Sequence, residues 1–290
     1  MRVAVTGVGL LCALGSEPDR VNEALAQGRS GLVPLLEAGH EATLGGRVPG
    51  PDLKRWLRRR KDRKLLPRAA QLALPVAGVA LGDWPGDRER LGLFVGVRRE
   101  PPDDGEADAA MAASAREGRL DSRLLAGTGR ALYPPLLPLK TLPNMVLAHI
   151  SINLGIRGRA DTCAGGAAAG AQALRMGLHA VAEGRCPAAL AVLADSQIDG
   201  GSLRDRRRVG DLVPGGEGAV ALMLQPQGHS DTLFELIDGG AGGAREGWSW
   251  SFVDSLGDCG TANPGIALVL GDEQAIGIDR GGAWARLHRA

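Results

Sequence analysis

The chain has 290 residues and a formal net charge of +1, and 44% of its residues are hydrophobic although only 3% are aromatic. This length is enough for one large core or for two fused halves. The near-neutral charge gives no general argument for binding nucleic acid or a membrane surface. The 44 glycines follow no fixed period, which excludes a collagen-like chain.

The cysteine usage indicates a reducing environment. Four cysteines lie far apart in the sequence, without the spacing of metal ligands: Cys12, Cys163, Cys186 and Cys259. We therefore expect a cytoplasmic protein that holds no metal and no other cofactor. The apolar run Val3–Leu14 lacks the cleavage site of a signal peptide, and no apolar stretch is long enough to cross a bilayer.

The first third of the chain alternates apolar runs of strand length with helical patterns. The expected elements are a strand at Val3–Thr6, a helix at Pro18–Gln27, a helix at Arg68–Leu81 and a strand at Leu91–Val97. Such alternation favours an α/β fold with a mostly parallel sheet. Gly7 and Gly9 follow the first strand as in a dinucleotide-binding loop, but the third glycine of that fingerprint would fall on Cys12, which disfavours a nucleotide site.

The centre of the chain predicts a strand followed by a buried helix. Asp161–Ala164 is expected to be a buried central strand, Gly165 and Gly166 a turn, and Ala167–Glu183 a helix that ends at Gly184. Four apolar residues recur at helical spacing on one face of that helix: Ala171, Leu174, Leu178 and Val181. Ala188–Ala194 is the next strand.

The start of this helix is a place where chemistry is expected. Unpaired N–H groups and partial positive charge at a helix N-terminus lower the pKa of a thiol and stabilise an oxyanion. A cysteine in the first turn would therefore be a plausible acyl acceptor. The residue at that position is Ala167.

The segment before the helix resembles the β-ketoacyl synthases of the thiolase superfamily. In that family a run N-M-x-x-x-H-x-S-x-x-x-G-x-x-G-P leads to T-A-C-x-[ST]-[GS] and a long helix. The matching residues here are Asn144, Met145, His149, Ser151, Gly155 and Gly158. Counting forward from Gly158 and backward from Gly184 places the family's cysteine at Ala167 both times. Cys163, in a triplet with Asp161 and Thr162, is the alternative nucleophile, but it requires a deletion before it and an insertion after it.

Other segments resemble the same family in the same order. The opening residues 3–31 match, as does the Gly216-Glu217-Gly218-Ala219 segment with its strand at Val220–Leu224. The resemblance implies a thiolase-like fold, with two βαβ halves in an α/β/α/β/α arrangement. We expect the halves to be residues 1–225 and an abridged C-terminal half, residues 226–290.

The C-terminal half is predicted to have few elements. Leu233–Ile237 is expected to be a strand, Gly239–Gly247 a glycine-rich connection, and Ser255–Leu270 a helix or a strand pair. Gln274–Ile278 and Ala283–Leu287 then form a hairpin across residues 279–282.

Condensation in this family also uses two further side chains, usually histidines, in H-G-T-G-T and G-H-x-x-G-A-A-G segments. The first segment has no counterpart in this sequence, and in Leu256–Ala262 the place of the second histidine is taken by Asp258. A carboxylate is an acceptor only and would repel an enolate. His149 and His179 are interpreted as structural.

Three functions therefore stay open. The first is a non-condensing subunit, similar to chain-length factors, in fatty-acid or polyketide-type biosynthesis. The second is an active synthase or acyltransferase that uses Cys163. The third is an accessory scaffold outside lipid metabolism. The resemblance implies a homodimer, or a heterodimer with an active synthase, formed through the strand at Asp161–Ala164.

The basic run Lys54–Lys64 has two interpretations. It is either a solvated face before the helix that starts at Arg68, or a docking patch for an acyl carrier protein through Arg58, Arg59, Arg60 and Lys61. Nucleic acid is disfavoured, because a tract with a single tryptophan lacks the aromatic side chains of a stacking platform. The acidic segment Pro101–Asp108 is expected to be an exposed loop.

Overall fold

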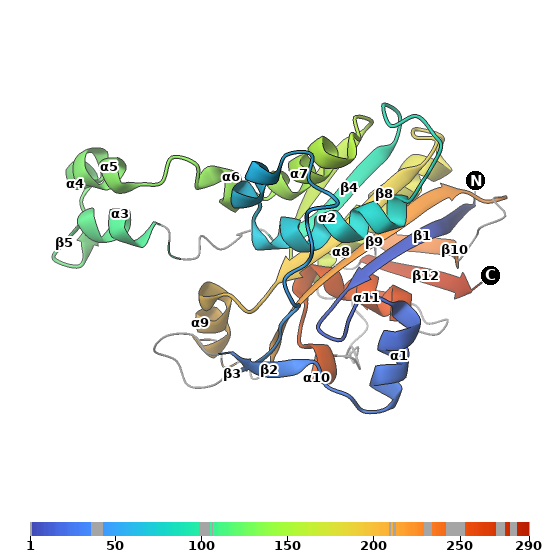
Figure 1. Cartoon of the computed structure of the whole chain (residues 1–290), viewed down its shortest axis with the longest axis horizontal. Coiled ribbons are helices and arrows are strands. Elements are labelled where there is room, and N and C mark those ends of the chain that lie inside the picture. Colours follow the sequence, from blue (N-terminus) through green and yellow to red (C-terminus); the bar gives the residue numbers. More distant parts are fainter. Residues whose placement is uncertain are drawn as a thin grey trace.

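The computed structural model describes residues 2–35, 43–98, 105, 107–208, 210, 213–228, 234–241, 253–270, 276–278 and 283–289. Within this part of the chain a large mixed sheet carries helices on both faces (Figure 1). The strands of the ten-stranded sheet are β1 (Val3–Leu11), β2 (Leu32–Leu35), β3 (Thr43–Gly46), β4 (Gly92–Arg98), β7 (Ala160–Gly165), β8 (Ala189–Ser196), β9 (Gly215–Pro226), β10 (Phe234–Ala241), β11 (Ile276–Ile278) and β12 (Ala283–Arg289).

The described helices are mostly short, and three of them are ten or more residues long. The α-helices are α1 (Pro18–Ala26), α2 (Arg68–Leu81), α3 (Asp108–Ala113), α4 (Ser122–Leu124), α5 (Arg130–Leu132), α6 (Pro138–Thr141), α7 (Asn144–Leu154), α8 (Ala167–Ala182), α9 (Gly200–Arg208), α10 (Val253–Leu256) and α11 (Asn263–Leu270). Three tighter or wider turns accompany them: η1 (Arg60–Leu65), η2 (Leu125–Gly129) and η3 (Gly260–Ala262). The α2 helix has the predicted bounds, and α8 begins at the predicted residue, Ala167.

The expectation of a mostly parallel sheet is wrong. The main order is β11-β12-β10-β1-β9-β8-β4-β7, and only β4 with its neighbours β7 and β8, and β3 with β9, pair in parallel. The β9 strand runs against both β1 and β8. A fully buried apolar strand has the same composition in either direction, so the sequence pattern predicted the strands but not their directions.

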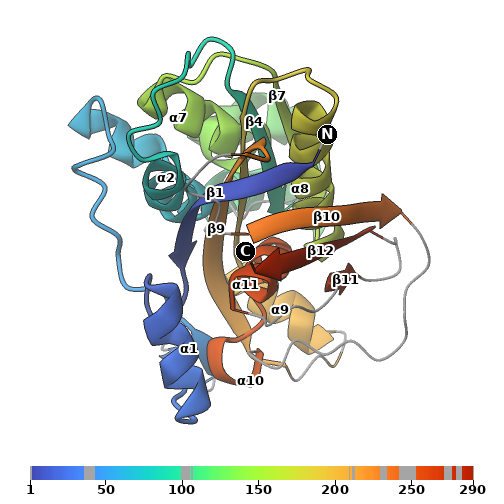
Figure 2. The same ribbon diagram turned by 90° about the vertical axis from the view of Figure 1, so that its right-hand side faces the viewer.

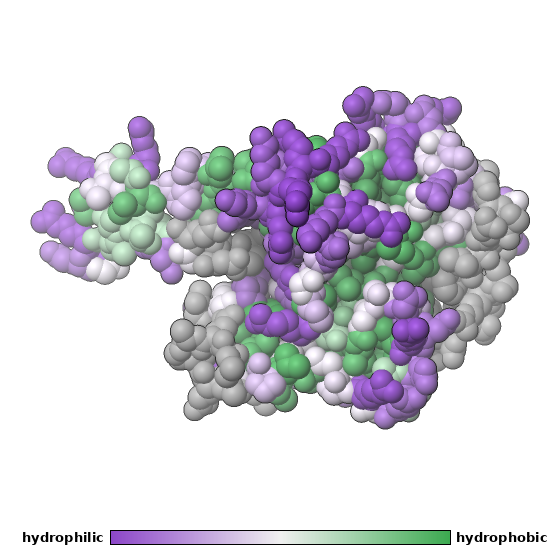
Figure 3. All heavy atoms as spheres, in the orientation of Figure 1, coloured by the Kyte–Doolittle hydropathy of each residue, from purple (hydrophilic) through white to green (hydrophobic). Residues whose placement is uncertain are grey.

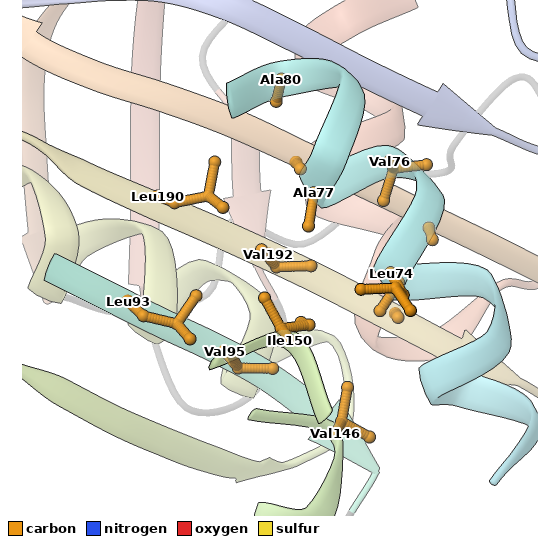
Figure 4. Close-up of a cluster of buried hydrophobic side chains, with 14 of the residues drawn as sticks. Leu74, Val76, Ala77, Ala80, Leu93, Val95, Val146, Ile150, Leu190 and Val192 are labelled. Atoms are coloured by element: carbon orange, nitrogen blue, oxygen red, sulfur yellow. The ribbon is translucent and has the colours of Figure 1, made fainter. Parts of the chain in front are cut away.

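The two faces of the sheet are covered by different helices (Figure 2). The α2 and α7 helices pack on one face, where Leu74, Val76 and Ile150 meet Val95 of β4 and Val192 of β8 (Figure 4). The α8 and α11 helices pack on the other face. The α8 helix contacts strands at both ends of the sheet order: β4 and β7 at one end, and β10, β11 and β12 at the other.

The glycines of β1 serve close helix packing. A Cβ at Gly7 would lie 2.1 Å from the Ala80 carbonyl oxygen of α2, and one at Gly9 would lie 2.2 Å from that of Val76. The absence of side chains at Gly7 and Gly9 lets α2 approach the strand. These glycines therefore have a packing role that accounts for their spacing without a nucleotide.

The β7 strand is not the buried central strand that was expected. It pairs with β4 alone among the described strands and forms the edge of the sheet, and Asp161 and Ala164 are exposed. The prediction followed from a short run of small residues, which suits a buried strand as well as an edge strand that another chain could cover.

The C-terminal elements continue the same sheet. The β10 strand pairs with β1, and β11 and β12 form the predicted hairpin, whose connection at 279–282 lies outside the described residues. Ser255–Leu270 contains α11 and η3 and no strand pair. Residues 242–247 of the predicted glycine-rich connection and Leu233 lie outside the described part, while Gly239, Gly240 and Ala241 belong to β10. The division at residue 225 stays a prediction.

Residues 107–143 project from the body of the molecule (Figure 1). They contain α3 to α6 and the small β5–β6 hairpin, Ala115–Arg116 with Arg119–Leu120. The predicted loop Pro101–Asp108 falls mostly outside the described residues, and its last residue, Asp108, begins α3. No helix among the described residues is long and apolar enough to span a bilayer. The described residues also hold no cluster of potential metal ligands.

Candidate functional site

The start of α8 lies at the edge of the sheet where β4, β7 and β8 have their carboxyl ends. In α/β folds this edge is the usual place of ligand sites. Gly166 caps α8 without a side-chain hydrogen bond, and the first turn has no acidic residue. The backbone N–H groups and the positive end of the helix dipole therefore have no competing side chain in that turn. Ala167 stands at this end and brings no nucleophile.

Cys163 meets α8 far from its N-terminus. The Cys163 Sγ lies 3.4 Å from the Met176 Sδ, and Met176 is nine residues beyond Ala167, or about 14 Å along the helix axis. Burial, with a smaller contribution from the Asp161 carboxylate, raises the pKa of the Cys163 thiol to about 11. A half-buried thiol with a raised pKa and an apolar contact behaves as a packing group.

A buried carboxylate lies beside the start of α8. Asp195, at the end of β8, accepts hydrogen bonds from the Thr261 backbone N–H and side-chain hydroxyl, both at 3.1 Å. Its carboxylate also accepts from Gln197 Nε2 at 2.8 Å and from the Ser196 N–H at 2.7 Å. The Thr261 hydroxyl is 3.4 Å from the carbonyl oxygen of Gly165, which directly precedes the helix cap. Asp195 and Thr261 thus connect β8, η3 and the β7–α8 turn.

Burial raises the pKa of Asp195 to about 6, although the backbone N–H of Thr261, the amide of Gln197, the charge of Arg98 and the backbone N–H of Ser196 oppose the shift. The side chain is therefore ionised at neutral pH and titrates just below it. It has four donors around it and only 1% exposure, so it can hold a proton or a hydrogen bond but has no direct path to bulk water.

Asp258 takes a different place from Asp195. Its carboxylate accepts from the Gly260 N–H at 2.9 Å and from Asn263 Nδ2 at 2.7 Å, and it pairs with Arg206 of α9. These contacts hold the loop between α10 and α11. The residue of this loop that reaches the start of α8 is Thr261, not Asp258. Whether Asp258 corresponds to a family histidine stays a prediction.

The two histidines discussed above make local contacts. His149 Nε2 lies 3.2 Å from the Leu65 carbonyl oxygen, and burial lowers the pKa of this histidine. His179 Nδ1 lies 3.5 Å from a carboxylate oxygen of Glu183, one turn along α8. Both contacts fit the structural roles expected for them.

A second buried carboxylate belongs to the opposite face of the sheet. Glu217 of β9 accepts two hydrogen bonds from Arg68, at 2.6 and 2.7 Å, one from the Val48 N–H at 3.0 Å and one from the Ser196 hydroxyl at 3.1 Å. Arg68 is the first residue of α2, so this pair fixes the start of that helix against the sheet. In the sequence, the segment around Glu217 is recognisable only by its resemblance to the family.

The sequence patterns did not predict a site role for Asp195 or Thr261, or the pairing of Arg68 with Glu217. A signal for Asp195 was present, because an acidic residue directly after a buried apolar run ends a strand at the edge where sites form. No comparable signal existed for Thr261, since its contact with Asp195 joins residues 66 positions apart.

Comparison with known proteins defines the class. Residues 1–219 match the family described as "Beta-ketoacyl synthase, N-terminal domain", so the chain belongs to the β-ketoacyl synthase family. This confirms the resemblance found in the sequence. Among curated relatives, nodulation protein E of Rhizobium leguminosarum bv. trifolii is 26% identical over 251 residues, which cover 79% of this chain and 59% of the relative. Nodulation protein E of Rhizobium sp. (strain N33) is 30% identical over 165 residues, covering 54% and 37%. The chain thus spans from about a third to three fifths of the length of these relatives.

Solved structures share the fold. A β-ketoacyl synthase from Burkholderia phymatum STM815 superposes with a TM-score of 0.66 at 21% identity, over 83% of this chain and 64% of that chain. The ishigamide ketosynthase/chain length factor has a TM-score of 0.71 at 16% identity, over 100% and 99%. A type II PKS acyl-carrier protein in complex with its ketosynthase reaches 0.74 at 15% identity, also over 100% and 99%.

Proposed function

We propose that this chain is a non-condensing subunit in fatty-acid or polyketide-type biosynthesis, which pairs with an active β-ketoacyl synthase. One observation carries the proposal: α8 begins with an alanine, Ala167, at the position where the family resemblance expects the acyl-accepting cysteine. The positive helix end can stabilise negative charge, but a methyl group cannot form a thioester.

The position of Cys163 supports this proposal over the active-synthase alternative. Its sulfur packs on Met176 in the third turn of α8, and its raised pKa disfavours the thiolate. An acyl acceptor needs a thiolate near the oxyanion-stabilising helix end. Cys163 lies away from the helix end, and its raised pKa keeps the sulfur protonated.

The two described histidines with printed contacts, His149 and His179, bind the Leu65 carbonyl oxygen and Glu183 rather than a group at the start of α8. Asp195 and Thr261 occupy this region and are hydrogen-bonded to each other. A carboxylate there would repel a developing enolate, whereas a family synthase is expected to bring histidines that stabilise one. The proposal therefore includes the loss of malonyl decarboxylation.

We propose that the partner joins at β7 and that an acyl carrier protein docks on the basic run. Among the described strands, β7 is paired on one side only. Arg58 and Arg59, which directly precede η1, and Arg60 and Lys61, which begin it, are exposed. The ketosynthase and chain length factor that are similar in fold support a paired arrangement. Replacing Arg60 and Lys61 by glutamine is expected to weaken carrier-protein binding measured by titration.

The test of the proposed function is acylation. Wild type, Ala167→Cys and Cys163→Ala are incubated with an acyl-loaded carrier protein, and the intact mass of each is measured. Wild type and Cys163→Ala are expected to gain no acyl group. Ala167→Cys is expected to gain at most a slow adduct, because the helix end is present while the decarboxylating side chains are not.

The controls separate the alternatives. An adduct on wild type that disappears in Cys163→Ala would overturn the proposal in favour of the enzyme that uses Cys163. Malonyl carrier protein in a parallel incubation measures decarboxylation, which is expected to stay at the uncatalysed rate. Failure of the chain to bind any synthase or carrier protein would instead favour a scaffold outside lipid metabolism.

A further inference from the structure

A cavity of about 680 Å³ opens on the face of the sheet that carries α2, opposite the face that carries α8. Its walls come from the carboxyl ends of β4 and β8, the start of α2 and the η1 turn. Apolar side chains of Val97 and Val146 line part of it. The volume is typical of small-molecule sites and leaves room for an organic body besides a charged group.

The polar part of the cavity wall is strongly basic. Six cationic residues line it: Arg47, Arg63, Lys64, Arg68, Arg98 and Lys140. They come from segments far apart in the sequence, so the fold gathers them. A concentration of positive charge of this kind in a concave site attracts anions.

Two of these cations are already paired and fixed in place. Arg68 binds Glu217 with two hydrogen bonds, and Arg98 binds Asp199 at 2.8 Å and also contacts the Ser202 hydroxyl. Both arginine side chains keep about a quarter of their surface exposed or slightly less. Their guanidinium groups therefore stand pre-oriented in the cavity wall rather than free to rotate.

The third acidic residue of the cavity wall, Asp195, does not neutralise Arg47, Arg63 or Lys64. Asp195 directs its carboxylate to Thr261 and Gln197, and successive side chains of a strand point to opposite faces. No carboxylate of the described residues pairs with Arg47, Arg63 or Lys64. The cavity thus keeps an excess of positive charge.

The N-terminus of α2 adds to the positive potential in the cavity. Pro67 caps the helix without a side-chain hydrogen bond, no acidic residue lies in the first turn, and Pro67, Arg68 and Ala69 line the cavity. A helix N-terminus next to arginine and lysine side chains is a common arrangement for binding phosphate groups.

We infer that this cavity binds a small phosphorylated molecule. Arginine forks and a helix end match the several acceptor oxygens of a phosphate, the lysines supply further charge, and the apolar wall accommodates a carbon skeleton. The inference does not depend on the proposed function, because the cavity lies on the α2 face and includes neither Ala167 nor Cys163.

The four lysines of the chain provide the test. Lys64 and Lys140 line the cavity, whereas Lys54 and Lys61 do not. The full chain is acetylated with a lysine-reactive reagent, with and without inorganic pyrophosphate at matched ionic strength, and each lysine is quantified by peptide mass spectrometry. Pyrophosphate is expected to slow acetylation of Lys64 and Lys140 severalfold and to leave Lys54 and Lys61 unchanged.

A pair of variants removes equal charge from the same turn. Arg63→Gln/Lys64→Gln changes cavity residues, and Arg60→Gln/Lys61→Gln changes exposed residues outside it. In calorimetric titrations the first variant is expected to bind pyrophosphate about tenfold more weakly than wild type, and the second within about twofold of it. Circular dichroism verifies that both fold, as expected for exposed side chains.

Several results would overturn the inference. One is the absence of protection or binding at millimolar pyrophosphate. Another is equal protection of all four lysines, or an equal loss of affinity in both variants, because general charge attraction would explain either. Protection by citrate as strong as that by pyrophosphate would contradict the assignment to phosphate.

Discussion

The Asp195 carboxylate is the most constrained charged group beside the start of α8. Four donors surround it, yet burial dominates and raises its pKa to about 6. Because an unfolded aspartate titrates near pH 3.9, the folded protein holds a proton that the unfolded chain has already lost between these values. The stability that Asp195 contributes is therefore full below about pH 4 and is lost as the pH rises to about 6.

Asp195→Asn should remove this pH dependence. Between pH 4 and pH 7 the free energy of unfolding of wild type is expected to fall by up to about 3 kcal/mol relative to that of the variant. Urea unfolding of wild type and Asp195→Asn at several pH values measures this difference in the free energy of unfolding. Asp83→Asn, which changes an exposed carboxylate, serves as the control and should follow wild type. Parallel curves for wild type and Asp195→Asn would contradict the argument.

At the residue scale, the sequence predicted some features of the site and missed others. Two counts along the chain placed a helix start at Ala167, and α8 begins there. Helix starts depend on local signals, here the Gly165-Gly166 turn, so they can be predicted locally. The contact between Asp195 and Thr261 depends on how η3 returns to the sheet, which no local signal contains.

At the element scale, the crossing of α8 over β4 depends on two glycines. A Cβ at Gly96 would lie 2.7 Å from the Gly170 Cα, and one at Gly170 would lie 2.2 Å from the Thr261 carbonyl oxygen. The helix therefore lies close to both the strand and η3 at one point. This close approach keeps the start of α8 next to Asp195 and Thr261.

Gly170→Ala tests this packing. Alanine is the better helix former by about 1 kcal/mol, but the added methyl group must displace backbone atoms. We expect a net loss of about 1–3 kcal/mol in the free energy of unfolding, measured with urea. Gly127→Ala is the matched control, because a Cβ there meets no atom within 4 Å, and it should cause no loss. Equal effects of the two changes would show that the crossing is looser than described.

The strands also show what periodicity can and cannot predict. Most strands of the first 225 residues were expected near their observed positions, because their apolar runs are unbroken. The directions of the strands were not predicted, because the connection between two strands decides whether they run parallel or antiparallel. The connection through α9, for example, joins β8 to the antiparallel β9. The projecting segment 107–143 was not predicted at all, because its short helices have no sustained apolar period.

At the scale of the whole molecule, most of the exposed large apolar side chains among the described residues lie on the projecting segment 107–143. Figure 3 shows hydrophobic residues on the projecting segment, flanked by hydrophilic ones. The exposed large apolar residues of this segment are Met111, Leu120, Leu125, Leu132, Tyr133, Leu136 and Leu142. Ile152 of α7, the helix that contacts β7, is exposed as well. Together with the edge strand, this surface has the composition of an interface rather than of a solvated face.

The dimer proposal therefore predicts which apolar residues affect association. Leu136→Asp and Ile152→Asp should each weaken pairing at least tenfold, either with a second copy or with an active synthase. Val79→Asp changes an apolar residue of α2 with similar exposure, 57% against 54% and 52%, and should leave the affinity unchanged. Burial of exposed apolar area supplies most of the free energy of such interfaces, and a buried unpaired carboxylate opposes it.

Sedimentation velocity measures the prediction across micromolar concentrations, with the chain alone and with a candidate synthase. Wild type is expected to sediment as a dimer in at least one mixture, because no second strand of the described residues pairs with β7 and the projecting segment exposes apolar side chains. A stable wild-type monomer in both mixtures would contradict the dimer. If all three variants weakened pairing equally, the interface would not lie on this side, and the edge of β7 would need another explanation.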